Sequence, residues 1–255
     1  MSKSFEDIVE LSRFLRSPQG CPWDREQTLS SIKKYILEEA YEVIQAIELN
    51  NKDELVEEMG DFLFQAIFAS QIASEEGIFD INDVLDQLHN KLIRRHPHVF
   101  GEKKAKDANE AVKSWHTQKM KEKSGEKRLL EIPRSMPSLL RAQRVGEKAS
   151  QVGFDWDNIS DVLSKVKEEL NELEIEIKKG DRVNYKKEFG DLIFSLVNLS
   201  RHLKIDAESE SHTAIDKFIK RFSILEDMAK ESKRPLADMS IEEMEALWQE
   251  VKEEV

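Results

Sequence analysis

The feature that most constrains this chain is an acidic pattern that occurs twice at a constant offset. In each half the sequence reads E-E-x-x-E, then a gap, then E-x-G-D. The first copy comprises Glu38, Glu39, Glu42, Glu58, Gly60 and Asp61, and the second copy, 130 residues further on, comprises Glu168, Glu169, Glu172, Glu188, Gly190 and Asp191. Two unrelated acidic helices would share composition but not this register. The pattern therefore predicts one helical unit that was duplicated with its carboxylates in place.

Composition and periodicity predict an all-α protein with two tandem helical domains. The 255 residues include few breakers, 9 Gly and 6 Pro, while Glu, Lys, Leu and Ile dominate, a balance typical of long helices. We expect an N-terminal domain over residues 1–122, a linker without helical periodicity over 123–136, and a C-terminal domain over 137–255. Each half should hold an antiparallel hairpin. The first is predicted from about Thr28 to Leu49 and back to Gly77, and the second turns at Gly180-Asp181 and returns to about Leu203.

Charge and targeting signals limit the partners. The formal net charge is -12, from 39 basic and 51 acidic residues, which opposes binding to a nucleic-acid polymer. The sequence contains no basic segment followed by an apolar stretch and no run of membrane-spanning length, so we expect no membrane partner and a cytoplasmic location. The single cysteine, Cys21, leaves no thiolate set for zinc.

The acidic spacing predicts a metal site. Positions i, i+1 and i+4 share one helix face, so Glu168, Glu169 and Glu172 project from one side, and Glu188 and Asp191 do the same on the facing helix. Five converging carboxylates repel one another unless a divalent cation or protonation compensates. Oxygen ligands favour Mg²⁺, with Mn²⁺ as a substitute. The Gly before each aspartate costs about 1 kcal/mol relative to Ala, which makes sense if something approaches closely there.

Two further pairs supply what a polyphosphate and a base require. Lys217 and Arg221 lie one helical turn apart and can neutralise phosphates, and Lys252 lies one turn from Trp248, whose face suits stacking on a base. The first half repeats both pairs as Lys91 with Arg95 and Trp115 with Lys119. Taken singly, such pieces are most often a solvated acidic face, surface charge and a packed tryptophan. Their joint repetition in register favours a nucleoside triphosphate site.

At this point the sequence resembles a known family. The runs C-P-W-D-R-E-Q-T (21–28), R-R-H-P-H-V-F-G (94–101) and V-G-F-D-W (152–156), together with both acidic motifs, are similar to the MazG family of nucleoside triphosphate pyrophosphohydrolases over nearly the whole chain. The resemblance implies an all-α NTP pyrophosphatase fold with tandem domains. It also implies a homodimer that converts ribo- and deoxynucleoside triphosphates to monophosphate and pyrophosphate with Mg²⁺. Family members often have His after the Gln-Thr pair, where this chain has Leu29.

The resemblance also implies roles for single residues. Glu169, Glu172, Glu188 and Asp191 would bind the metal, and Lys217, Arg221 and Trp248 would contact the nucleotide. The second domain is the one that the family associates with catalysis, and differences between the copies agree: Lys165, Lys187 and Asn198 stand where the first copy has Tyr35, Glu57 and Phe68. The second site is more cationic and more polar. We therefore rank the first site, with Glu38, Glu39, Glu42, Glu58, Asp61 and Arg95, as structural or weakly active.

The mechanistic hypothesis is attack of water on the α-phosphorus, with Glu168 as general base and pyrophosphate as the leaving group. One alternative is a di-iron carboxylate protein, but such bundles use Glu-x-x-His, and the matching positions here are Asp61 and Asp191. Another is a helical module that binds nucleotide or a partner helix without turnover, which applies most to the first domain. The residues leave open the preferred base and sugar.

Overall fold

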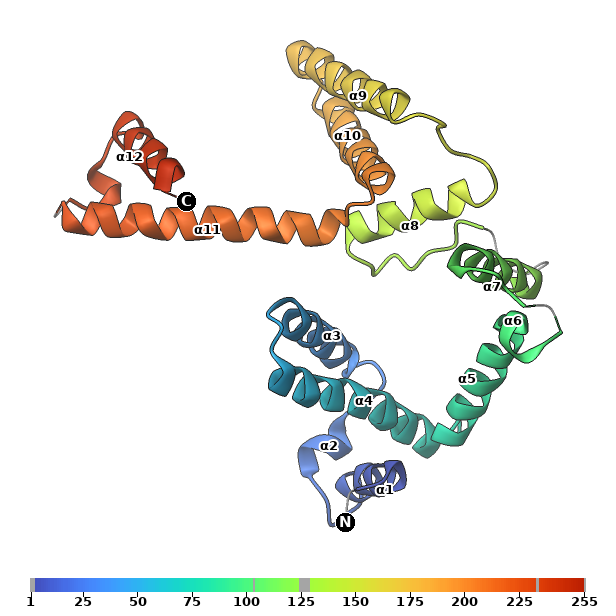
Figure 1. The fold of residues 1–255 in the computed structure, drawn as a ribbon. Coiled ribbons are helices and arrows are strands. Elements are labelled where there is room, and N and C mark those ends of the chain that lie inside the picture. Colours follow the sequence, from blue (N-terminus) through green and yellow to red (C-terminus); the bar gives the residue numbers. More distant parts are fainter. Residues whose placement is uncertain (1–2, 103, 124–128, 233, 255) are drawn as a thin grey trace. The chain divides into compact units, whose positions relative to one another are not determined.

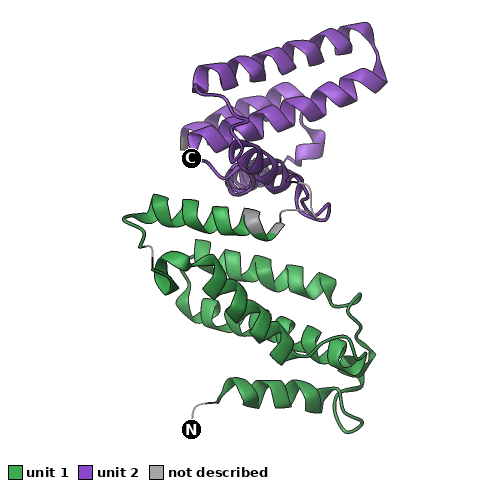
Figure 2. Ribbon diagram, turned by 90° about the vertical axis from the view of Figure 1, so that its right-hand side faces the viewer, with its two compact units in different colours: residues 1–124 green, residues 125–255 purple. Residues whose placement is uncertain are grey.

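The structure is a computed structural model, which describes residues 3–102, 104–123, 129–232 and 234–254. Within these ranges every regular element is a helix, which confirms the predicted all-α class (Figure 1). The chain forms two compact units, Met1–Ser124 and Gly125–Val255 (Figure 2). Among the helices described, no stretch combines the length and the apolar character needed to cross a lipid bilayer.

The first unit is organised around one long helix. Its elements are α1 (Phe5–Leu15), α2 (Pro22–Glu26), α3 (Lys33–Glu48), α4 (Lys52–Glu75), α5 (Ile81–Arg95), α6 (Pro97–Phe100) and α7 (Ala108–Lys123). Helices α1, α3 and α5 all pack on α4, and α7 packs on α5 and α6. Ile32, Phe68 and Ile72 form a buried cluster, with Tyr35 and Phe64 packed against it. This apolar core joins the α3–α4 hairpin.

The second unit repeats that order. It contains α8 (Ser138–Ser150), α9 (Ile159–Lys179), α10 (Arg182–Leu203), α11 (Ala207–Glu231), a 3₁₀ turn η1 (Leu236–Asp238) and α12 (Ile241–Glu254). Helix α9 pairs with α10, α8 packs on α10 and α11, and α12 packs on α11. Val251 of α12 is fully buried, as are Leu225 and Ala229 of α11. The duplication seen in the acidic motifs therefore extends to the helix packing.

The same turn closes both hairpins. Asn50 and Gly180, one offset apart, both adopt the left-handed conformation, with φ of 52° and 73°. The amides of the next residues, Asn51 and Asp181, donate to the carbonyl five positions earlier, at 3.1 and 3.3 Å, as in a Schellman motif. The side chains of Asn51 and Asp181 then cap α4 and α10. Because the turns match, the carboxylates of both hairpins fall in the same register.

The start of one helix differs from the sequence expectation. Helix α3 begins at Lys33 and not near Thr28, because the Thr28 and Ser31 hydroxyls accept hydrogen bonds from each other's amides, at 3.1 and 2.9 Å, and hold a turn. Helix α7 runs to Lys123. Residues 124–128 of the predicted linker lie outside the described residues, whereas 129–136 are irregular. Ile132 in that stretch is buried, so this part of the linker packs into the second unit.

Candidate metal and nucleotide site

In the second unit the five carboxylates singled out in the sequence come together. Glu168, Glu169 and Glu172 of α9 form one group, and Glu169 forms another with Glu188 and Asp191 of α10; within each group one oxygen per residue lies within 4.8 Å of the others. Glu169 belongs to both groups and is only 6% exposed. We call these residues the second-unit carboxylate cluster. Its donors are all carboxylate oxygens, a set that fits a hard divalent cation.

Lys165 provides a counter-charge on α9. Its Nζ lies 2.8 Å from Glu168 Oε1 and 2.6 Å from Glu169 Oε1. These hydrogen bonds, the one to Glu168 first, raise the pKa of Lys165 above its ordinary value. The ammonium is therefore a member of the cluster and stays charged.

Negative charge still accumulates on the α10 side. Desolvation by burial, followed by the charges of Glu172, Asp191 and Glu169, raises the pKa of Glu188. A raised carboxyl pKa means that the ionised form is disfavoured where it stands. A divalent cation between α9 and α10 would relieve that repulsion.

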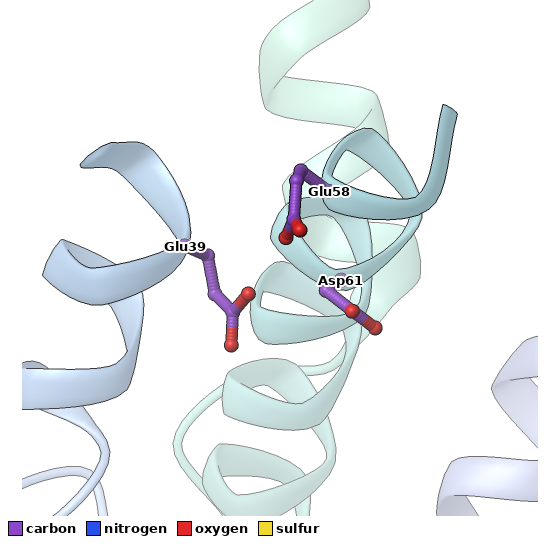
Figure 3. Close-up of side chains that lie close together, drawn as sticks. All are labelled: Glu39, Glu58 and Asp61. Atoms are coloured by element: carbon purple, nitrogen blue, oxygen red, sulfur yellow. The ribbon is translucent and has the colours of Figure 1, made fainter. Parts of the chain in front are cut away.

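The first unit holds a smaller group. Figure 3 shows Glu39 projecting from α3 toward α4, where Glu58 and Asp61 lie one turn apart, and an oxygen of each lies within 4.8 Å of the others. The side-chain amide of Gln65 donates to Glu39 Oε1 at 3.2 Å. We call Glu39, Glu58 and Asp61 the first-unit carboxylate group.

The other acidic residues of the first copy lie around this group. Burial raises the pKa of Glu58, with the charge of Glu42 next, so Glu42 lies near without belonging to the group. Burial also raises the pKa of Glu39, followed by the charge of Asp61. Glu38 is exposed and lies outside the group.

The residues expected to contact the nucleotide lie on other helices of the second unit. Figure 1 shows α11 leading away from the α9–α10 hairpin, with α12 packed at its far end. Arg221 lies about 20 Å along α11 from the junction with α10. Its Nε is buried without a hydrogen-bond partner, and the Trp248 ring packs on Phe218 at 5.2 Å between centroids. Among the described residues, the structure has no hydrogen bond, ion pair or ring contact between Arg221 or Trp248 and the second-unit carboxylate cluster.

The remaining predicted residues have local partners. Lys187 Nζ and Lys252 Nζ each lie 3.5 Å from a side-chain oxygen one turn away, in Asn184 and Gln249. In the first unit, Arg95 forms an ion pair with Glu122 at 2.6 Å. The structure thus places these groups at helix surfaces and not in one pocket.

Asn198 shows a network that sequence reasoning missed. It is buried, and its Oδ1 accepts from Arg201 Nε at 3.0 Å and from Arg201 Nη2 at 2.8 Å. Arg201 Nη1 donates to Asp155 Oδ2 at 2.9 Å, and this guanidinium holds the pKa of Asp155 below its usual range. A signal existed: Arg201 follows Asn198 by one turn, where the first copy has Gln71.

Comparison with known proteins agrees with the geometry. The MazG nucleotide pyrophosphohydrolase domain profile matches residues 27–100 and 158–223, two segments that each contain one acidic motif. A relative from Thermotoga maritima, named nucleoside triphosphate pyrophosphohydrolase/pyrophosphatase MazG, is 45% identical over 250 residues, spanning 97% of this chain and 95% of its own. The nucleoside triphosphate pyrophosphohydrolase of Escherichia coli K12 is 41% identical over 251 residues, spanning 96% and 95%. With both halves matched and the expected family resemblance confirmed, this chain belongs to the MazG nucleotide pyrophosphohydrolase family.

Proposed function

We propose that this chain hydrolyses ribo- and deoxynucleoside triphosphates to monophosphate and pyrophosphate, with Mg²⁺ at the second-unit carboxylate cluster. The activity agrees with the family and with the names of both relatives. One observation supports the assignment of the activity to this site. Five carboxylates from two helices converge there, and among the described residues Lys165 is the one ammonium paired with them. Such an excess of negative charge needs a cation, and a metal bound by carboxylates keeps positions open for phosphates.

Glu169, Glu172, Glu188 and Asp191 would hold the metal. When bound, Mg²⁺ supplies Lewis acidity toward the phosphates and lowers the pKa of water, and Mn²⁺ would substitute. Glu168 lies at the exposed edge of the cluster and accepts the proton of the attacking water. The water oxygen bonds to the α-phosphorus, the bond from the α-phosphorus to the bridging oxygen breaks, and pyrophosphate leaves with the electron pair. Lys165, whose Nζ lies 2.8 Å from Glu168 Oε1, would face the incoming phosphates.

The functional unit would be a homodimer. Arg221 and Trp248 stand on α11 and α12, and α11 leads away from the α9–α10 hairpin, so a second copy would bring Lys217, Arg221, Trp248 and Lys252 to the cluster. Apolar side chains on the hairpin and on α11 support such an interface: Phe189, Phe218 and Ile219 are 56%, 56% and 55% exposed.

Gly190 supports close approach from outside the chain. A Cβ built at Gly190 meets no atom within 4 Å, so packing inside the described chain does not require a glycine there. The residue nevertheless costs about 1 kcal/mol relative to Ala in a helix. A phosphate or a second copy beside Asp191 would explain it.

A second function, binding of a partner without turnover, fits the first unit. There Glu39 has a neutral partner, Gln65, and Arg95 is already paired with Glu122. We also place the protein in the cytoplasm, where nucleoside triphosphates are abundant.

Product analysis tests the proposal. The full chain is incubated with Mg²⁺ and a panel of NTPs and dNTPs, and monophosphate, diphosphate, pyrophosphate and phosphate are separated by chromatography. Monophosphate with pyrophosphate is expected, and a chelator should abolish both. Diphosphate with phosphate, or no product from any nucleotide, would contradict it.

A further inference from the structure

Glu122 of α7 lies between two guanidinium groups of α5. Arg95 donates from Nε and Nη2 to Glu122 Oε2 at 2.9 and 2.6 Å, and Arg94 donates from Nε to Oε1 at 2.6 Å. Both carboxylate oxygens are thus held by arginine, as arginines hold phosphate oxygens. These hydrogen bonds, the ones from Arg95 first, lower the pKa of Glu122 to about 2. Glu122 is therefore a permanently charged internal anion at neutral pH.

The Glu122 pair is not an ordinary surface ion pair. The side chains of Arg95 and Glu122 are only 17% and 18% exposed. The Arg95 guanidinium also lies over the Trp115 ring at 5.4 Å from its centroid, and Lys119 Nζ lies over the same ring at 4.7 Å. An exposed pair contributes little, but the Arg95–Glu122 contact is shielded from water, and Arg95 is bound by both Glu122 and the Trp115 ring. Arg94, whose side chain is 57% exposed, supplies the remaining hydrogen bond to the carboxylate.

The second unit repeats the cations and the ring without the anion. Trp248 and Lys252 correspond to Trp115 and Lys119, and at that spacing Glu122 corresponds to Val255, which lies outside the described residues. Arg221, the counterpart of Arg95, has a buried Nε with no hydrogen-bond partner. The Trp248 ring contacts Phe218. Among the described residues, Arg221 Nε of the second unit is therefore left without a partner, whereas its counterpart in Arg95 is held by Glu122.

We propose that Arg94, Arg95 and Trp115 form a polyphosphate-binding site in the first unit, and that Glu122 fills it as an internal anion which excludes nucleotide. The class of ligand rests on the proposed function, since it is carried over from the second unit. The geometry is that of a competitor: phosphate oxygens can accept from Arg95 Nε and Nη2 only after the Glu122 carboxylate has left them. Removing the charge of Glu122 frees the site.

The test counts bound nucleotide by isothermal titration calorimetry. The probe is α,β-methylene-ATP with Mg²⁺, because its α–β bridge resists hydrolysis, and the full chain is used. Wild type should bind one equivalent per chain, and Glu122→Gln should bind two. Asp86→Asn, which removes a negative charge from an exposed position of α5, should still bind one. Arg95→Met added to Glu122→Gln should return the count to one.

The outcomes separate this proposal from the proposed function. A folded Glu122→Gln variant, judged by an unchanged helical circular dichroism signal, that still binds one equivalent overturns the proposal. If that variant does not fold, Glu122→Ala, which also removes the carboxylate, takes its place under the same criterion. If wild type neither hydrolyses nor binds nucleotide, the proposed function fails. Inorganic tripolyphosphate then tests the site alone: binding gained on Glu122→Gln supports it, and no gain overturns it.

Discussion

In the first unit Glu39 accepts a hydrogen bond from the Gln65 amide at 3.2 Å, whereas its counterpart Glu169 in the second unit pairs with the Lys165 ammonium at 2.6 Å. The counterpart of Gln65 is Ser195, whose hydroxyl donates to a backbone carbonyl of its own helix at 2.8 Å. An amide satisfies a carboxylate without neutralising it, while an ammonium compensates charge and can also face phosphates. Identical carboxylates in identical register are thus given different surroundings.

Two further positions near the carboxylates are also aromatic in the first unit and polar or charged in the second. Tyr35, the counterpart of Lys165, packs its ring against Trp23 at 5.6 Å, and Phe68, the counterpart of Asn198, belongs to the buried apolar cluster. In the second unit these positions hold an ion pair and a polar network instead. The first hairpin has used these positions for its core, and the second has kept them polar beside its carboxylates. The two units therefore differ in the groups that surround the carboxylates and not in the carboxylates themselves.

The largest expected effect is a loss of activity when a carboxylate of the second unit is neutralised, without a matching loss when its counterpart in the first unit is neutralised. Glu188→Gln should lower kcat/KM for NTP hydrolysis by about 10²–10³-fold, because it removes a proposed ligand of the metal that stabilises the developing charge. Glu58→Gln, at the same register in the first unit, should change it less than twofold. Steady-state pyrophosphate release checks both. Equal losses in the two variants would assign catalysis to both units.

Loss of the unpaired guanidinium should come next. Arg221→Ala should lower kcat/KM by about 10–100-fold, since a hydrogen bond to a charged group contributes about 1.5–3 kcal/mol. Lys230→Ala removes the same charge from an exposed position near the end of α11 and should leave the rate unchanged. If the two variants lower kcat/KM equally, Arg221 acts only through the electrostatic potential of the whole protein and not through a specific contact.

Lys165→Met tests whether the additional positive charge of the second site contributes to NTP binding. The variant removes the ammonium held by Glu168 and Glu169, so the KM for NTP should rise about tenfold. Tyr35→Phe is the matched change in the first unit and should have no effect on KM. Kinetics over a range of substrate concentrations separate KM from kcat. An unchanged KM in Lys165→Met would reduce Lys165 to a structural partner of its carboxylates.

The smallest expected effect is the pH dependence of the stabilisation that Glu122 provides. Because Arg95 and Arg94 lower its folded-state pKa to about 2, the ionised carboxylate stabilises the first unit above its unfolded pKa of about 4.3, and that stabilisation is lost as pH falls toward 2. Wild type should therefore melt a few degrees higher than Glu122→Gln at pH 7. The difference should shrink steadily between pH 5 and pH 3 in thermal scans. A gap that is independent of pH would mean that Glu122 stabilises by packing alone.

Much of the fold follows from local signals. The predicted ends at Lys179 and Leu203 agree with the structure because Gly180 and Asp181 form a left-handed turn and a cap within a few residues. The start of α3 was wrong because the hydroxyls of Thr28 and Ser31 compete with the helix for backbone amides. The convergence of the acidic side chains could be predicted from the sequence for a similar reason, and so could the family. Helical spacing and a matched turn are enough to align two faces.

Two helical units with carboxylates in one register follow from the order of the residues, because periodicity, turns and caps act over a few residues. The charge that each functional group meets depends instead on how the helices pack. Gln65 reaches Glu39 across 26 residues, Arg95 reaches Glu122 across 27 and Arg201 reaches Asp155 across 46. Such contacts depend on how neighbouring helices pack and on which long side chains then point at each other. No spacing rule within a single helix contains that information.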